Sequence, residues 1–80
     1  MKREEIIEKL TCIFRNVFTD ATLIITDEMT SNDVEKWDSL THMLMISEVE
    51  TAFEIKFKLK DLNKMKNVGN LIDIIESKLA

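Results

Sequence analysis

The chain contains no proline and a single glycine, Gly69, in 80 residues. Tight β-hairpin turns usually need glycine at positions of positive φ, so a chain this poor in turn formers favours helices over tight-turned β structure. Hydrophobic cores divide only in much longer chains, and we therefore expect residues 1–80 to form a single domain.

Apolar residues recur with helical spacing in three segments of the chain. The first helix is predicted over residues 4–18. The second should begin at Asp38 or Ser39, both good N-cap types, and run to about Glu54. A short helix capped by Asp61 and a last helix capped by Asn67 should follow. The predicted inner residues are Ile6, Ile7, Leu10, Ile13, Phe14, Val17 and Phe18 in the first helix, Leu40, Met43, Leu44, Ile46, Val49 and Phe53 in the second, and Val68, Leu71, Ile72, Ile75 and Leu79 in the last.

Two connecting segments lack this spacing. Residues 19–37 are rich in turn formers, and Leu23, Ile24 and Ile25 are expected to pin them to the core. Because so long a loop is uncommon in a small domain, it should contain a short helix or serve a function. Residues 55–60 alternate like a strand, but a lone strand is unstable, so we predict an extended connector with its apolar residues turned inward.

The composition excludes several classes of site. One cysteine, Cys12, and one histidine, His42, allow neither a disulfide framework nor a typical zinc site. The acidic residues 27–35 lack the central glycine of a calcium-binding EF-hand loop. No apolar run is long enough to span a membrane, and the acidic N-terminus does not resemble a signal peptide, so we expect a cytoplasmic protein. The net charge of −4 argues against a nucleic-acid partner.

The charge is distributed unevenly along the chain. Residues 26–54 hold eight acidic residues and one lysine, whereas residues 55–80 hold six lysines and three acidic residues. One interpretation is an ordinary solvated surface. The other is an acidic face around the second helix that docks basic partners.

Asp38-Ser39-Leu40 is the segment with the most specific chemistry. A serine at the start of a helix projects its hydroxyl toward solvent, where free N–H groups and a partial positive charge favour an attached phosphate. On local sequence alone, however, helix capping by Asp38 or Ser39 is the more common explanation.

With Asp38-Ser39-Leu40 placed after a long loop, and with Phe57, Leu62, Met65 and Val68 in register, the chain resembles an acyl carrier protein along nearly its whole length. The resemblance implies an all-α four-helix bundle with a long first loop and a short third helix. It implies a non-catalytic carrier whose Ser39 holds 4′-phosphopantetheine, transferred from coenzyme A by a phosphopantetheinyl transferase. The terminal thiol of this arm would carry an acyl group as a thioester.

The implied partners are the transferase and the acyl-loading, acyl-transfer or synthase enzymes, which would bring basic docking surfaces to a monomeric carrier. The predicted docking residues are Asp38, Leu40, Thr41, Met43, Glu48 and Glu50. Thr41 and Leu44 stand where the best-known fatty-acid carriers have acidic residues, Trp37 stands where a small residue is common, and residues 56–66 are rich in lysine. A pathway for polyketides, peptide-like products or surface polysaccharides is therefore as consistent with the sequence as general fatty-acid synthesis.

Two alternatives to a carrier function involve the second helix. An unmodified helical adaptor would dock basic partners through the acidic second helix without using Ser39. A triad of Asp38, Ser39 and His42 is feasible at helical spacing, but the chain lacks an oxyanion loop and the mass for a cleft.

The remaining distinctive side chains have ordinary explanations. Met43 and Met65 are expected in the core, while Met45 lies off the main apolar stripe. Trp37 should either pack over the junction of loop and helix or contact a partner. Cys12 is expected to be an inert, partly buried thiol.

Overall fold

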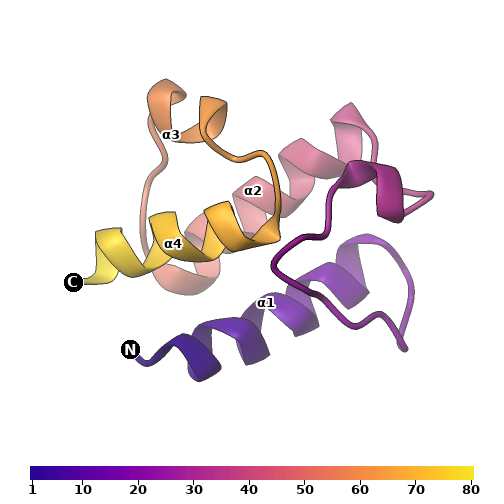
Figure 1. Cartoon of the computed structure of the whole chain (residues 1–80), viewed down its shortest axis with the longest axis horizontal. Coiled ribbons are helices and arrows are strands. Elements are labelled where there is room, and N and C mark those ends of the chain that lie inside the picture. The colour runs from indigo at the N-terminus through magenta and orange to yellow at the C-terminus, as the bar shows by residue number, and fades with distance from the viewer.

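The computed structural model describes residues 1–80, and its helices agree closely with the predicted segments. The elements are α1 (Arg3–Val17), the 3₁₀ turn η1 (Ser31–Asp33), α2 (Ser39–Phe53), α3 (Leu59–Asn63) and α4 (Val68–Leu79). Helix α1 packs against both α2 and α4, whereas the short α3 lies at the edge of the molecule (Figure 1). The fold is therefore all-α, with four helices of which the third is short. None of the helices combines the length and apolar character needed to cross a membrane.

The core is entirely apolar. Helix α1 buries Ile6, Leu10 and Phe14, which recur every four residues and so form one stripe along the helix. Phe18 extends the stripe just beyond the end of the helix. The remaining buried side chains are Val34, Met45, Ile46, Val49, Phe53, Ile55, Val68, Leu71, Ile72 and Ile75.

The predicted inner face of α2 was partly wrong. Leu40, Met43 and Leu44 are 80%, 57% and 50% exposed, whereas Met45, which was expected off the stripe, is only 1% exposed. Residues 43–46 are all apolar, so periodicity alone does not determine which side of this helix faces inward. Packing of α2 into the common core selects the side of Met45 and Ile46 and leaves Leu40, Met43 and Leu44 exposed.

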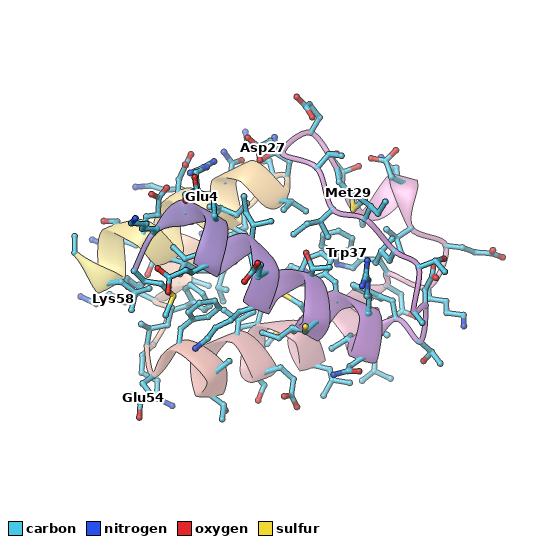
Figure 2. The ribbon with its side chains drawn as sticks, turned by 90° about the horizontal axis from the view of Figure 1, so that it is seen from below. Glu4, Asp27, Met29, Trp37, Glu54 and Lys58 are labelled. Carbon is cyan, nitrogen blue, oxygen red and sulfur yellow. The ribbon has the colours of Figure 1, made fainter.

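The long connection between α1 and α2 is fixed to the start of α4. It contains the short helix η1, one of the two expected alternatives. The backbone carbonyls of Asp27 and Met29 accept hydrogen bonds from the N–H groups of Gly69 and Val68, each at 2.9 Å. Figure 2 labels Asp27 and Met29 on this connection. Two otherwise unpaired N–H groups of the first turn of α4 are satisfied in this way.

Not every residue expected to pin the loop does so. Leu23, Ile25 and Met29 pack against the core, but Ile24 is 72% exposed. Arg3 adds an electrostatic connection, because its guanidinium lies 3.5 Å from the Asp27 carboxylate and 3.0 Å from that of Asp73. The loop is therefore held to both α1 and α4.

The connector after α2 begins as predicted and then turns into α3. Ile55 is buried and Phe57 half-buried, but Leu59 begins the helix and is 74% exposed, so its expected inward orientation was wrong. The Glu50 carboxylate accepts a hydrogen bond from the Phe57 N–H at 2.8 Å, which holds the connector against α2.

Asp61 does not cap α3 at the N-cap position, as was expected. That position belongs to Lys58, and the carboxylate of Asp61 in the first turn accepts the Lys58 N–H at 2.8 Å. Asp61 also pairs with the Lys78 ammonium of α4 at 2.9 Å. The pKa of Asp61 is lowered mainly by the hydrogen bond from the Lys58 N–H and, to a smaller extent, by the contact with Lys78. Asn67 caps α4 as predicted, accepting from the Asn70 N–H.

Candidate functional site

The start of α2 is capped by Asp38, which leaves the side chain of Ser39 unused. The Asp38 carboxylate accepts a hydrogen bond from the Thr41 N–H at 2.9 Å, and Thr41 Oγ1 accepts one from the Asp38 N–H at 2.8 Å. The first of these bonds lowers the pKa of Asp38. Ser39 is exposed and its hydroxyl makes no hydrogen bond to the protein. Of the two capping candidates, Asp38 alone has that role.

The free hydroxyl of Ser39 lies in a favourable position for an anion. It belongs to the first residue of α2, a helix of 15 residues, at the end where the backbone dipoles sum to a partial positive charge. A phosphate esterified there would be stabilised by this charge. The site therefore suits a serine that is modified, rather than one that attacks a substrate.

Trp37, directly before the cap, packs over the junction of the loop and α2. Its indole ring lies with its centroid 5.4 Å from those of Phe14 and Phe18. Its Nε1–H donates a hydrogen bond to His42 Nδ1 at 3.1 Å, and the two rings are stacked at an interplanar angle of 17°. Of the two expected roles for Trp37, the structure supports packing.

The hydrogen bonds at this junction also rule out a catalytic triad among these residues. His42 Nδ1 accepts the Trp37 indole N–H and is therefore not free to contact Asp38 or Ser39. The carboxylate of Asp38 is occupied by Thr41. Neither Asp38 nor Ser39 makes a hydrogen bond to His42 through its side chain, so no base is positioned to activate the serine.

Two hollows lie on either side of the Trp37–His42 pair. An open depression on the outside is lined by Ser31, Trp37, Asp38, Ser39, His42 and Met43. A small cavity of about 80 Å³ also borders the pair, and its other lining residues are Ser31, Met45, Met65, Lys66, Asn67 and Leu71. The outer depression offers room beside Ser39, whereas the inner cavity is much smaller than an ordinary ligand pocket.

The predicted docking residues fall into two groups. Leu40, Met43 and Glu48 are exposed and make no side-chain hydrogen bond. Asp38, Thr41 and Glu50 have structural contacts, the first two in the cap of α2 and the third with the connector.

Leu44 is an exposed residue that the sequence analysis had assigned to the core. It lines a shallow groove with Glu48 and with Ile13, Asn16 and Val17 of α1. The apolar run at residues 43–46 was the available signal, since one helix cannot bury every side of such a run. The exposed side of α2 beside Ser39 is therefore more apolar than its acidic composition suggested.

Cys12 is exposed, which corrects the expectation of partial burial. In addition, no three or more histidine, cysteine, aspartate or glutamate side chains gather into a group that could hold a metal ion.

Comparison with known proteins supports the resemblance noted in the sequence. An acyl carrier protein of Coprothermobacter proteolyticus is 32% identical over an alignment of 84 positions, which covers 99% of this chain and 96% of the relative. The solution structure of a holo acyl carrier protein from Geobacter metallireducens matches with a TM-score of 0.86 and 46% identity, covering 91% of this chain and 84% of that one. No family model matches the chain.

Proposed function

The chain belongs to the acyl carrier protein family, whose members are non-catalytic carriers, and we propose that Ser39 bears its 4′-phosphopantetheine arm. The observation that carries this proposal is the division of roles at the start of α2. Asp38 caps the helix, and the hydroxyl of Ser39 is exposed and free of hydrogen bonds.

The residues around Ser39 fit this group. The helix N-terminus would stabilise the phosphodiester, and the open depression beside Ser39 would accommodate the start of the arm. When bound, the arm supplies a thiol that holds an acyl group as a thioester. The chain itself contributes a rigid attachment point, because Trp37 and the Asp38–Thr41 cap fix the first turn of α2.

We further propose that partner enzymes dock on the exposed side of α2. Asp38 and Thr41 hold its first turn, Leu40 and Met43 supply apolar contact, and Glu48 and Glu50 supply negative charge for basic surfaces on the partners. These partners include the phosphopantetheinyl transferase and enzymes that load, transfer or extend the acyl group. The exposed Leu44, at a position where the usual fatty-acid carriers are acidic, favours a dedicated pathway over general fatty-acid synthesis. We expect a cytoplasmic monomer.

Loading of the purified chain tests the attachment site. After incubation with coenzyme A and a broad-specificity phosphopantetheinyl transferase, the intact mass should rise by one phosphopantetheine group. Ser39→Ala should show no gain. Ser47→Ala, which removes an exposed serine from the same helix, should be loaded like the wild type. No gain in the wild type, or an equal gain in Ser39→Ala, would contradict the proposal.

The dependence of loading on docking can be measured with the same enzyme. Leu44→Ser should raise the transferase KM with little change in kcat, whereas Leu59→Ser, which alters an even more exposed leucine on α3, should leave KM unchanged. Glu48→Lys should raise KM more at low salt than at high salt, because screening weakens a charge contact.

A role as an unmodified adaptor would instead leave cellular function intact in Ser39→Ala and abolish it in Glu48→Lys.

A further inference from the structure

The segment around α3 carries five lysines that have no ionic partner. All five, Lys56, Lys58, Lys60, Lys64 and Lys66, are exposed, and we call them the α3 lysine cluster. The ion pairs of the molecule involve only Arg3 and Lys78 among the basic residues. The positive charge of the cluster is therefore available to a partner outside the chain.

The outward side of α3 is basic with one apolar residue, and its inward side is committed to the bundle. Asp61, the one acidic residue between Lys56 and Lys66, pairs with Lys78, while Leu62 packs against the core. Leu59 lies between two members of the cluster and is 74% exposed. Figure 1 shows α3 at the edge of the molecule, where such a surface is accessible.

We propose that the α3 lysine cluster binds the surface of an anionic lipid bilayer. Protein–protein interfaces are enriched in arginine and depleted of lysine, but the cluster contains lysine alone. Groups of four to eight basic residues are typical of binding to anionic lipid, where flexible, hydrated ammonium groups need no fixed partner geometry. The exposed Leu59 supplies an apolar side chain that can enter the interface between headgroups and acyl chains.

The net negative charge of the chain does not prevent this contact. The molecule measures 31 × 25 × 22 Å, whereas the Debye length at physiological salt is only about 8 Å. Carboxylates remote from α3 are therefore screened from the bilayer. Each lysine close to an anionic surface strengthens partitioning by roughly fivefold, so five of them suffice for weak, reversible binding.

Contact through α3 would also hold the start of α2 close to the bilayer. Met65 and Lys66, which follow α3, line the same small cavity as Trp37 and His42, next to Ser39. A carrier bound in this way could exchange its acyl group with an enzyme embedded in the membrane. That consequence rests on the proposed function of Ser39, whereas lipid binding itself does not.

Sedimentation with lipid vesicles tests the proposal on the full chain. At an ionic strength of about 0.15 M, where remote carboxylates are screened, the chain should sediment with vesicles of phosphatidylcholine containing roughly a quarter phosphatidylglycerol, and not with pure phosphatidylcholine. The triple variant Lys58→Ala, Lys60→Ala and Lys64→Ala should bind at least about tenfold more weakly. The matched control, Lys2→Ala, Lys9→Ala and Lys36→Ala, has the same net charge and should bind within about twofold of the wild type. Circular dichroism checks that both variants are folded.

Several results would overturn the proposal. These are no binding of the wild type to anionic vesicles, equal binding to neutral vesicles, or an equal loss in the control triple variant. Binding to poly-glutamate without binding to vesicles would assign the cluster to an acidic protein surface instead. Ser39→Ala should bind vesicles normally, so failure of phosphopantetheine loading and failure of lipid binding are separable outcomes.

Discussion

The indole Nε1–H of Trp37 donates a hydrogen bond to Nδ1 of His42 at 3.1 Å, and the two rings are stacked. This contact joins the end of the long loop to the first turns of α2, immediately beside Ser39. It requires an unprotonated Nδ1, because a protonated imidazole has no acceptor nitrogen. The junction that holds the proposed attachment site is therefore sensitive to the protonation of one histidine.

Stability should fall as the pH drops below the ordinary histidine pKa of 6.5. Burial lowers the pKa of His42 in the folded chain, so in the range just below pH 6.5 the unfolded chain binds more protons than the folded chain does. Protonation then favours unfolding. Urea unfolding at about pH 7.5 and about pH 5.5 should show this loss in the wild type.

His42→Gln provides the control for this prediction. Glutamine keeps an acceptor for the Trp37 Nε1–H but does not titrate in this range, so the variant should lose less stability on acidification. Trp37 is the single tryptophan, so its fluorescence should change with pH below about 6.5 in the folded wild type and not in His42→Gln. Identical pH dependence in the two proteins would contradict the assignment to His42.

Two methionines of α2 should differ sharply in their contribution to stability. Met45 is 1% exposed and Met43 is 57% exposed. Met45→Ala should lower the free energy of unfolding by about 2–5 kcal/mol, because it leaves a cavity in the core. Met43→Ala should change it by less than about 0.5 kcal/mol. Chemical denaturation of both variants measures the difference, and equal losses would show that the helix packs by another face.

Gly69→Ala should destabilise the protein, although alanine is the better helix former. A Cβ at this position would lie 3.1 Å from the Asp27 carbonyl oxygen, which also accepts the hydrogen bond from the Gly69 N–H. Relieving that contact would move the loop off α4, and we expect a loss of about 1 kcal/mol in the free energy of unfolding. Ser77→Ala, at an exposed position of the same helix, should be neutral or slightly stabilising. A stabilised Gly69→Ala would show that the loop yields without cost.

Asp38→Ala should lower the melting temperature and slow loading of Ser39, because it removes the acceptor for the Thr41 N–H. Asp38→Asn keeps an acceptor oxygen and should retain most of the stability. The free energy of unfolding of Asp38→Asn should also vary less with pH in the acidic range than that of the wild type, because asparagine does not titrate. The lowered pKa of Asp38 means that its contribution is present above the ordinary pKa of 3.8 and is lost as the pH falls through the folded value. Equal losses in the alanine and asparagine variants would contradict a capping role.

The helices could be predicted from the sequence because their determinants are local. Apolar spacing placed α1, and apolar spacing with the caps Asp38 and Asn67 placed α2 and α4, within one or two residues of their observed bounds. The Asp38-Ser39-Leu40 segment was recognisable for the same reason, since a cap and the residue after it are set by neighbours in the chain. The family resemblance then supplied the expected role of Ser39.

Only the tertiary structure decided which side of each element faces inward and which polar groups are occupied. Met45 rather than Met43 is buried because the rest of the bundle packs against one side of a helix that is apolar on several. Glu50 binds the backbone of a connector seven residues away, so a carboxylate that looked free in the sequence has a structural contact. Such choices depend on contacts between segments distant in the chain, which local spacing does not encode. The same packing leaves Ser39 exposed with a free hydroxyl, while its neighbour Asp38 caps the helix.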